Sequence, residues 1–452
     1  MNFARSISRG VFGGWYYDPT YGRAGLPEFW LNLMQRSAQG QPSAPPLPAK
    51  PLPAKTLPRQ ALFYALLCAG TGATLPFMPL WLREHGMSGS QIAWILAVPL
   101  LGRAITGPIS GIWADRFHKY RTPIALLALA STLAYAAMTI AGGWTDYRFA
   151  AFMLLYGIGY TGITNITPLL DAMTLQLSRI EGFAFGLARA AGSASFVFAN
   201  VCLGYLLQSL GTDAALQWMI LTALLVFAGA RFLLPGHVRL DLKLGQSAPA
   251  LPGFQRLATL LRGKGYIVLL IAIGCLQAAH SYYYAFSTII WEKRGFSSNI
   301  CGLLWATGVA GEFIFLSLGA ALRRRLGPWN LLLIGAAAGV LRWAVMMTSP
   351  PLDLLWPLQL LHGLSFAAVY VAGLELVHLL VPPGFEGLGQ TINSAYAGGA
   401  LIGVGTLASG FVFEAFGERG YGLMTVLALA GMAGALWLYA SRHRLISASP
   451  ST

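Results

Sequence analysis

The sequence is poor in charged residues: Asp, Glu, Lys and Arg make up only 10% of its 452 residues, whereas 56% are hydrophobic. A soluble globular chain carries about 25% charged residues, so an ordinary soluble protein is excluded. Cysteine is also scarce, and the four cysteines stand singly in apolar segments, which excludes a disulfide framework and a cysteine metal site. A glycine-rich phosphate loop after a strand is missing too. We therefore expect neither a metal nor a cofactor.

What the sequence has instead is a series of apolar runs of about twenty residues, the length that crosses a hydrocarbon core about 30 Å thick. Membrane-crossing strands would alternate over about ten residues, whereas these runs are continuous, so each is predicted to be a helix. We therefore expect an all-α integral membrane protein with twelve transmembrane helices. The predicted spans are residues 61–82, 91–114, 122–142, 149–175, 186–208, 216–235, 266–290, 300–322, 329–348, 354–380, 391–415 and 420–440.

The few charges are unevenly distributed. Thirty Lys and Arg against sixteen Asp and Glu give a net charge of +14. With the N-terminus placed inside, 21 Lys and Arg lie on the N-terminal side of the predicted spans, 5 on the other side and 4 within spans. The positive-inside rule then places both termini in the cytoplasm of a bacterial inner membrane. Topology accounts for much of the positive charge, so no nucleic-acid partner is needed.

Polar segments divide the chain. Residues 1–60 are rich in Pro, Gly, Ser and basic residues and repeat Pro-Leu-Pro-Ala-Lys, so we expect a disordered cytoplasmic tail. Residues 236–265 form the longest polar interval between spans and separate them six and six. The expected units are an N-terminal six-helix bundle at 61–235, a cytoplasmic linker at 236–265, a C-terminal bundle at 266–440 and a cytoplasmic tail at 441–452.

The two sets of six spans resemble each other. A shift of 209 residues aligns short turn and mid-span segments, and a shift of 206 aligns residues 204–211 with 410–417. Two matches at nearly one offset favour an internal repeat, although glycine-rich apolar segments can also match by chance. We therefore expect two pseudo-symmetric bundles. The aligned positions are Gly86 with Gly295, Ser88 with Ser297, and 102–103 with 311–312.

A basic loop joins the second and third predicted spans and carries the most specific motif. It reads Gly111-Ile-Trp-Ala-Asp115-Arg116 and continues to Arg121. This resembles the signature loop of the major facilitator superfamily of transporters. Glycine permits close helix contact, and an acid at a helix end can pair with basic groups, so Gly111, Asp115, Arg116 and Arg121 are a candidate conformational latch. An ordinary basic loop is the alternative, and residues 319–325 of the second half lack the Asp.

Ionisable residues deep in predicted spans each cost about 3 kcal/mol unless they are paired or wetted, so each is a functional hypothesis. Glu312, Arg342 and His362 occupy mid-positions of three consecutive spans. A titratable carboxylate, a permanently charged guanidinium and an imidazole in one cavity would make a proton site. A buried structural network without proton movement is the alternative.

The first half contributes a separate set. Asp171 and Arg189 flank one short cytoplasmic loop and are predicted to form a buried ion pair, with either a structural role or a substrate or gating role. Arg103 also lies within a span. Arg231 can extend its charge to the membrane interface, and His378 lies near the end of its span, so neither is a candidate.

Several segments resemble the 3-phenylpropionic acid transporter family within the lactose permease-like proton symporters. The resemblance covers residues 61–440 and implies a proton symporter of an aromatic carboxylate, with Glu312, Arg342 and His362 serving the proton. Glu375 departs from the lactose permease pattern, because thirteen residues, about 20 Å of helix, separate it from His362. The matching segments are Leu75-Pro-Phe77, Trp81-Leu, 276–287, Trp291, Gly302-Leu-Leu-Trp305, 308–312, 341–343 and Gln359-Leu-Leu-His362-Gly.

The resemblance also implies a cation for the carboxylate and an aromatic cage for the ring. The candidate substrate contacts are Arg103, Arg189, Phe77, Tyr283, His280, Gln277 and Trp305, with Trp81, Tyr282 and Tyr284 as further possible walls. Trp81 and Trp291 lie at span ends, where an interfacial aromatic belt is the alternative. For Gln277 and His280 the alternative is a hydrogen bond between packed helices.

The expected function is secondary active transport: proton-coupled uptake of a small aromatic carboxylate by alternating access. The expected partners are the small-molecule substrate, protons and the lipid bilayer, and one chain suffices for a pathway. A sugar or nucleoside symporter is the first alternative, and a drug or solute exporter the second. An intramembrane enzyme and a non-transporting membrane scaffold are alternatives of a different class.

Overall fold

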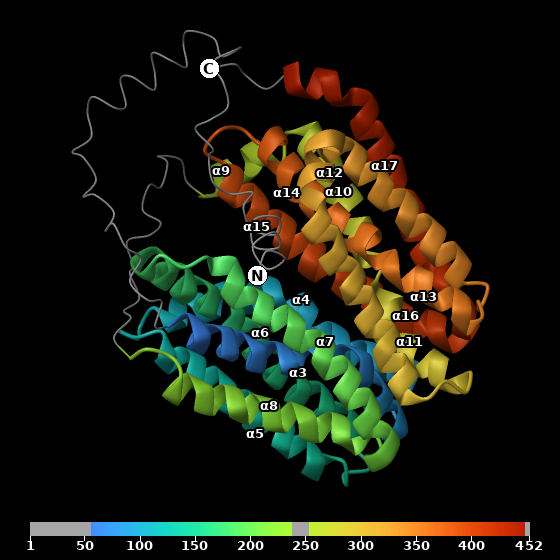
Figure 1. Cartoon of the computed structure of the whole chain (residues 1–452). Coiled ribbons are helices and arrows are strands. Elements are labelled where there is room, and N and C mark those ends of the chain that lie inside the picture. The colour runs from blue at the N-terminus through green and yellow to red at the C-terminus, as the bar shows by residue number, and fades with distance from the viewer. Residues whose placement is uncertain (1–55, 237–252, 448–452) are drawn as a thin grey trace, which may run out of the picture.

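The computed structural model describes residues 56–236 and 253–447. Within these ranges every regular element is a helix, as expected (Figure 1). Most of the predicted N-terminal tail and most of the predicted linker lie outside the described residues, so the expectations for them stay predictions.

The first six membrane helices form one bundle, coloured blue to green in Figure 1. Helix α3 packs against α7 and α8, α5 against α6 and α8, and α4 against α6. All six contain an apolar stretch long enough to cross a membrane. Their bounds are α3 Leu57–Glu84, α4 Gly89–Ala114, α5 Arg121–Ala141, α6 Arg148–Glu181, α7 Phe185–Leu210 and α8 Asp213–Phe232.

The remaining helices form a second bundle, in which α12 packs against α17, and α10 packs against α16 and α17. Helix α12 is two helices that meet at Gly327, whose φ of 70° and ψ of 164° interrupt the helical backbone. The bounds are α9 Gly253–Leu260, α10 Lys264–Ala278, α11 Ser281–Lys293, α12 Ser298–Met346, α13 Leu352–Leu360, α14 Val369–Leu380, α15 Glu386–Ala395, α16 Leu401–Phe416 and α17 Tyr421–Ser447.

The number of spans agrees with the expected twelve. The described residues contain eleven helical segments that are long and apolar enough to cross a membrane. The last of them, Glu386–Leu445, has 60 residues, about three times the length of one span. A 3₁₀ turn, η4 (Gly417–Gly420), interrupts it, so it supplies two spans.

The internal repeat is visible in the backbone. Gly86 and Gly295, aligned by the 209-residue shift, both have positive φ, 81° and 87°. Ser88 and Ser297 follow as helix N-caps with nearly equal angles, φ −69° and ψ 166° against φ −68° and ψ 153°. Because an L-residue rarely adopts φ near 80°, the glycines fix the turn in each half. A glycine at the turn and a serine at the helix N-cap therefore give both halves the same local backbone.

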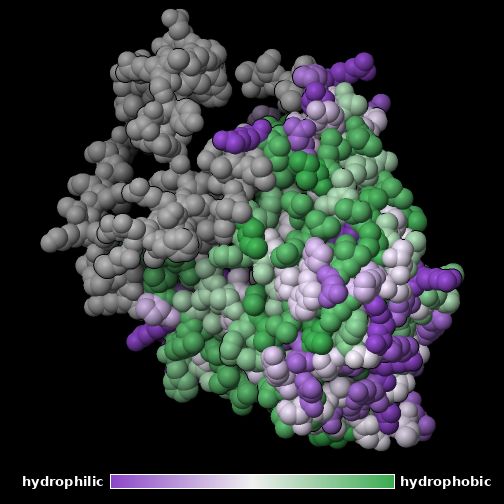
Figure 2. Space-filling model, turned by 45° about the vertical axis from the view of Figure 1, so that its right-hand side comes forward, coloured by the Kyte–Doolittle hydropathy of each residue, from purple (hydrophilic) through white to green (hydrophobic). Residues whose placement is uncertain are grey.

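The surface matches a protein surrounded by lipid. Figure 2 shows hydrophobic side chains over most of the middle of one face, with hydrophilic ones gathered at the top and at the lower right. Large apolar side chains such as Ile112 and Phe232 stand exposed, at 66% and 78%. Exposure on this scale would be unusual in water but is expected where the solvent is a hydrocarbon.

The two bundles meet at one end. We call the end where α3 begins and α17 ends the terminal side. At the opposite side, α4 packs on α16 and α7 on the first half of α12. There the Ser90 backbone N–H donates to Glu414 Oε1 at 2.9 Å, and a Cβ built on Gly204 would collide with the Ser298 carbonyl. The bundles are therefore sealed at the opposite side, and the space between them faces the terminal side.

Three spans of the second bundle depart from regular α-helix. The seventh span breaks between α10 and α11, where His280 takes φ −98° and ψ −6°. The tenth contains a π-helical turn, η2 (Gly363–Ala368), and the eleventh another, η3 (Tyr396–Ala400). Such turns shift the side chains that follow onto another face and often occur at functional sites. Two of the three irregularities, at His280 and η2, lie beside the site described next.

Candidate functional site

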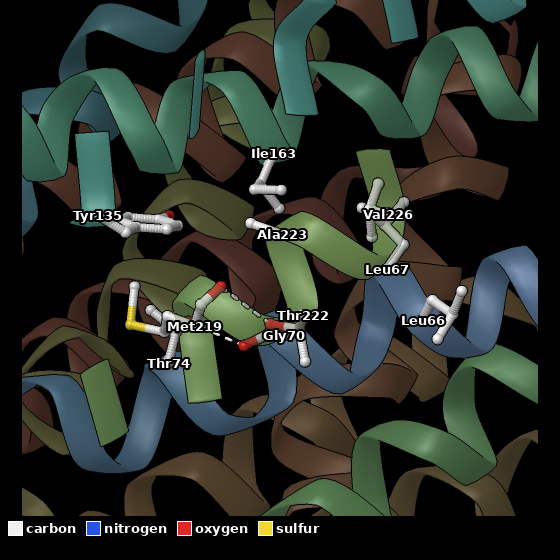
Figure 3. A pocket seen from close by; sticks show the side chains of 10 residues that line it. All are labelled: Leu66, Leu67, Gly70, Thr74, Tyr135, Ile163, Met219, Thr222, Ala223 and Val226. Atoms are coloured by element: carbon white, nitrogen blue, oxygen red, sulfur yellow. Dashed lines mark hydrogen bonds between the residues drawn. The ribbon is translucent and has the colours of Figure 1, made fainter. Parts of the chain in front are cut away.

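A cavity of about 290 Å³ lies between the two bundles. Small-molecule sites have about 300–1,000 Å³, so this one suits a small solute. A second pocket, between α3, α5, α6 and α8, has only about 10 Å³, room for about one water molecule (Figure 3). The first bundle lines the larger cavity with Tyr64, Leu67, Cys68, Leu75, Thr167, Arg189, Gly192, Ser193 and Phe196, and the second with Tyr283, Tyr284, Trp305, Val309, Glu312, His362 and Phe366.

Two glycines bring the polar groups of the second bundle together. A Cβ built on Gly311 would collide with the Leu360 carbonyl, and one built on Gly363 with the Gly311 carbonyl. The eighth and tenth spans therefore touch backbone to backbone, as small residues allow in membrane helices. Glu312 and His362 each stand next to one of these glycines, so the contact places their side chains side by side.

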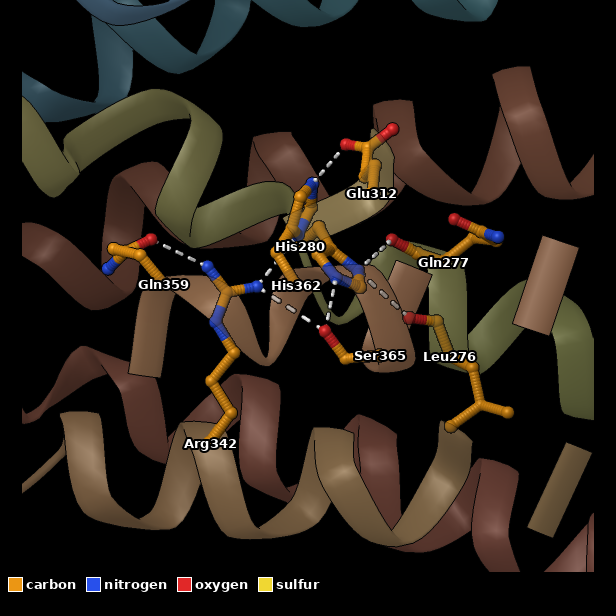
Figure 4. A network of polar contacts seen from close by, with 8 residues as sticks. All are labelled: Leu276, Gln277, His280, Glu312, Arg342, Gln359, His362 and Ser365. Carbon is orange, nitrogen blue, oxygen red and sulfur yellow. Dashed lines mark hydrogen bonds and ion pairs between the residues drawn. The ribbon is translucent and has the colours of Figure 1, made fainter. Parts of the chain in front are cut away.

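The structure joins the three residues predicted for the proton site into one network (Figure 4). His362 Nε2 lies 2.9 Å from Glu312 Oε1. Arg342 Nη1 lies 2.8 Å from His362 Nδ1, and Arg342 Nη2 donates to Gln359 Oε1 at 2.8 Å. Thus one ring nitrogen of His362 contacts the carboxylate and the other contacts the guanidinium.

These contacts determine where the histidine proton lies. A guanidinium can only donate hydrogen bonds, so His362 Nδ1 must accept from Arg342 and carries no proton. The single imidazole proton is then on Nε2 and is donated to Glu312. His362 is held neutral as long as Arg342 bonds it. Of the three predicted residues, Glu312 is therefore the one whose protonation leaves the network intact.

A second histidine is fixed in the same way. His280 Nδ1 lies 3.1 Å from the Leu276 carbonyl and 3.3 Å from the Gln277 carbonyl, so this nitrogen carries the proton. Its Nε2 lies 3.4 Å from the Ser365 hydroxyl. Ser365 in turn accepts from Arg342 Nη1 at 3.4 Å. At the helix break the Leu276 and Gln277 carbonyls therefore lie within reach of His280 Nδ1 and fix a proton on that nitrogen.

Burial increases from the cavity to the interior of the bundle. The Glu312 side chain is 24% exposed and that of His362 7%, whereas Arg342 is fully buried. The Arg342 guanidinium lies 4.8 Å from the ring centre of Tyr283 and 4.4 Å from that of Trp343. Its charge is therefore compensated by ring faces and acceptors rather than by water. Both Glu312 and His362 line the cavity, and the carboxylate is the more exposed end of the network.

Across the cavity, Arg189 carries the charge of the first bundle. It lies about one turn from the start of α7, and its Nη1 donates to Asp171 Oδ2 at 2.9 Å. The Tyr64 hydroxyl donates to the other oxygen of Asp171 at 2.6 Å. The predicted ion pair is formed, but it is not buried: Arg189 is 51% exposed and Asp171 29%. The expectation of burial was wrong because the pair lies along an open cavity rather than between packed helices.

Aromatic rings line the cavity between these two polar groups. Tyr284 and Trp305 stack with ring centres 6.0 Å apart, and Tyr283 contacts Trp305 at 4.5 Å. Phe366 stacks on His362 at 5.1 Å. Phe196 faces them from the first bundle. Of the predicted substrate contacts, the structure therefore places Arg189, Tyr283 and Trp305 on the cavity wall.

The other predicted substrate contacts lie elsewhere. Phe77 is fully buried and is not among the residues that line the cavity. His280 and Gln277 lie behind the cavity wall, at the break between α10 and α11. Face assignments made for an unbroken helix fail there, because the break changes the direction of every following side chain.

The two tryptophans for which an interfacial belt was the alternative are also buried. Trp81 donates its indole N–H to Asp213 at 2.9 Å and stacks on His85 with ring centres 3.9 Å apart. Trp291 is buried as well, at 1% exposure. Neither therefore belongs to an aromatic belt. Of the three consecutive tyrosines, Tyr282 points away from the cavity and donates its hydroxyl to the Gly417 carbonyl.

The remaining predicted residues are on α4 and the loop that follows it. Arg103 is exposed, with its Cβ 3.9 Å from a Cβ built on Gly399 of η3. Asp115 and Arg116 are exposed at the end of α4, and the ion pairs among the described residues do not include Asp115. No heavy atom lies within 4 Å of a Cβ built on Gly111. The helix contact proposed for the latch is thus absent while the terminal side is open.

Sequence reasoning missed some partners of the site. Gln359 and Ser365 were assigned no role, although each lies three residues from His362 and therefore on its face of the helix. Tyr64 was missed because its bond to Asp171 joins residues 107 positions apart. In the described part of the chain no group of three or more His, Cys, Asp or Glu side chains could hold a metal ion.

Comparison with known proteins gives this arrangement its context. The MFS_1 like family matches residues 57–421, four fifths of the chain. The chain belongs to this family. As a family member it is a multi-pass membrane transporter of the major facilitator type that acts on a small molecule, and not an enzyme.

The names of the relatives indicate different substrates. A probable 3-phenylpropionic acid transporter of Escherichia coli (strain K12) is 28% identical over 377 residues, which cover 82% of this chain and 95% of the relative. A maltose permease of Geobacillus stearothermophilus is 27% identical over 360 residues, 78% of this chain and 86% of the relative. Among solved structures, the nucleoside transporter NupG has a TM-score of 0.73 at 16% identity, covering 85% of this chain and 98% of NupG. That last likeness shows the fold alone.

Proposed function

We propose that the protein takes up a small aromatic monocarboxylate together with protons, by alternating access across a bacterial inner membrane with both termini in the cytoplasm. The observation that carries the proposal is the position of Glu312. Its carboxylate reaches the cavity while His362 and Arg342 hold it from behind. A carboxylate so placed can take a proton from the cavity without breaking the network that positions it.

The cavity supports a substrate with an aromatic ring and one negative charge. Arg189 uses one nitrogen for Asp171 and has further donors that can meet a substrate carboxylate. Tyr284, Trp305 and Phe366 offer ring faces a short distance away. A volume of about 290 Å³ suits one ring with a short side chain better than a disaccharide.

In the proposed cycle, the terminal side is the cytoplasmic side and the present structure is the inward-open state. Return to the outward-open state requires the bundles to separate at the opposite side, which breaks the contact between Ser90 and Glu414. It also requires closure at the terminal side, where Asp115 would pair with the facing bundle. A proton on Glu312 and a substrate anion at Arg189 would both favour this rearrangement, so coupling follows from linkage. One chain would be sufficient for the pathway.

A sugar symporter is the second candidate, because the maltose permease is nearly as similar as the 3-phenylpropionic acid transporter. A neutral sugar would need donors and acceptors around the cavity but no cation. The two candidates therefore differ in Arg189: its neutralisation should abolish transport of a carboxylate and have a smaller effect on a neutral solute.

Substrate-dependent proton movement in proteoliposomes tests the proposal. The vesicles contain a pH dye and are exposed to 3-phenylpropionate, phenylacetate, a disaccharide or a nucleoside. We expect a saturable, protein-dependent proton signal for the aromatic acids that Glu312→Gln abolishes while substrate exchange continues. Glu375→Gln, the same change at an exposed position on the tenth span, is the matched control and should keep the signal. A proton signal for the neutral solutes only would refute the aromatic substrate.

A further inference from the structure

The charges at the cavity sum to zero. Among the described residues, two charges line it, Arg189 and Glu312, and two more are bonded to its lining, Asp171 to Arg189 and Arg342 to His362, which gives two positive and two negative groups. His362 adds no charge, because its hydrogen bond from Arg342 fixes it as a neutral imidazole. His280 is buried behind the cavity wall, where the cost of burying an unpaired charge favours its neutral form. The other titratable groups that line the cavity are Tyr64 and Cys68 of α3 and Tyr283 and Tyr284 of α11, and Tyr421 of α17 lies near Arg342. All are ordinarily neutral near pH 7.

The sum becomes important when the cavity closes. In the present structure water reaches Arg189, Asp171 and Glu312 and screens any imbalance. Closure of the terminal side removes that water, and an unbalanced charge in a low-dielectric cavity is strongly disfavoured. A bound proton alone would leave the cavity at +1, and a bound monoanion alone at −1. Only the empty cavity and the cavity holding both are neutral.

Resting on the proposed function, we propose that this charge balance makes transport electroneutral, with one proton for each monocarboxylate, and that Asp171 is the residue that sets the count. Asp171 acts on specificity through Arg189, which it contacts, and does not itself contact the substrate. By cancelling the charge of Arg189 it prevents the empty carrier from holding a net positive cavity. A monoanion is therefore accepted only together with a proton on Glu312.

The proposal distinguishes between classes of substrate. A monocarboxylate with a proton leaves the closed cavity neutral, whereas a neutral solute with a proton leaves it at +1 and a dicarboxylate with one proton leaves it at −1. We therefore expect monocarboxylates to be transported with protons and dicarboxylates to be rejected. Arg103 is not among the residues that line the cavity, so its charge is left out of this sum.

The decisive variant is Asp171→Asn. Without this carboxylate the cavity with ionised Glu312 has a charge of +1, so a monoanion neutralises it with no proton. Asp171→Asn should therefore behave like Glu312→Gln, although Asp171 makes no contact with Glu312. It should bind and exchange the anion but lose net proton-coupled uptake. Restoring the charge sum with Asp171→Asn combined with Arg189→Gln should restore proton uptake on binding, although with weaker binding.

The measurement is the number of protons taken up per bound anion, in weakly buffered detergent solution, with 3-phenylpropionate as the probe over a pH series. The undissociated acid leaks passively across a lipid bilayer and accumulates to the same gradient as electroneutral symport would produce. Measuring binding in detergent avoids this leak, because no bilayer separates two compartments. We expect uptake to approach one proton per anion for the wild type at pH values where Glu312 is ionised, and none for Asp171→Asn. Asp171→Glu, which keeps the charge, and Asp146→Asn, the same change in an exposed turn, should both keep the wild-type count.

The outcomes separate this inference from the proposed function. One proton per anion in both the wild type and Asp171→Asn would overturn the charge balance and leave the proton-coupled carboxylate transporter standing. Binding of the anion without proton uptake by the wild type would overturn both. The dependence of uptake on membrane potential in proteoliposomes provides a second readout. Uptake by the wild type should not depend on the potential. If one net charge moved with each substrate, accumulation would change by about fiftyfold per 100 mV.

Discussion

The two bundles share a backbone plan but hold their charges differently. In the second bundle Arg342 is fully buried and hydrogen-bonded through both terminal nitrogens, and Glu312 is the most exposed member of the network. In the first bundle Arg189 and Asp171 are 51% and 29% exposed, and Arg189 keeps donors beyond the one that binds Asp171. A closed network holds one carboxylate in a fixed place, as a proton site requires. An open pair can exchange its partner for a ligand, as a substrate site requires.

The repeat makes the contrast sharper at one pair of positions. The 209-residue shift aligns Arg103 with Glu312, so corresponding positions carry opposite charges. Glu312 follows Gly311, which touches the tenth span, and joins the network there. Arg103 follows Gly102, where a built Cβ meets only Thr106 of its own helix, and its side chain is exposed. Close backbone contact therefore decides which of the two aligned residues is built into a network.

Removing the buried cation should have the largest effect on stability. Arg342→Gln leaves His362, Gln359 and Ser365 without their shared donor in a dry interior, so we expect unfolding free energy to fall by about 1–3 kcal/mol for each group left unsatisfied. Arg189→Gln removes a half-exposed partner and should cost only about 0–1 kcal/mol, while strongly weakening carboxylate binding. Thermal unfolding in detergent compares the two. Equal losses would contradict the assignment of a closed and an open site.

The aligned glycines offer the next comparison. Gly311→Ala places a methyl group against the Leu360 carbonyl, and the overpacking should cost about 1–3 kcal/mol and impair proton coupling by moving Glu312. Gly102→Ala meets no other helix and should be neutral or slightly stabilising. Unfolding curves and proton-coupled uptake of both variants provide the measurement. If Gly102→Ala were as harmful as Gly311→Ala, the two halves would not differ in the way described.

The latch distinguishes the halves at the terminal side. Asp115 has no counterpart in residues 319–325, so closure of that side should depend on the first half alone. Asp115→Asn should slow transport about two- to fivefold, the range expected for one charge at a helix end, with little change in KM. Initial rates over a range of substrate concentrations give both quantities. An unchanged rate would make the loop purely topological.

Arg103 should have the smallest effect. Its exposed charge lies outside the cavity, so Arg103→Gln should weaken the attraction of anions to the mouth without changing the number of protons per anion. The expected change is a modest rise in KM that disappears at high salt, since the Debye length falls from about 10 Å at 0.1 M to about 3 Å at 1 M. Uptake at both ionic strengths checks this. A loss of proton coupling would move Arg103 into the site.

Sequence reasoning predicted the parts of this account that depend on composition and spacing along one helix. The spans follow from apolar runs, and the meeting of Glu312, Arg342 and His362 follows from their mid-span positions. The partnership of Arg189 with Asp171 follows from the short loop between them. The misplaced residues depend on packing between helices: Trp81 is buried because Asp213 accepts its N–H, and His280 lies behind the wall because the helix breaks beside it. Neither feature has a local signal.

Infrared difference spectroscopy of the protein with and without 3-phenylpropionate tests the central claim most directly, because it detects protonation of a carboxylate itself. We predict that substrate binding produces the carbonyl band of one protonated carboxylic acid, and that Glu312→Gln abolishes this band while substrate still binds. A band that persists in Glu312→Gln, or binding by the wild type without such a band, would contradict the assignment of Glu312 as the proton site.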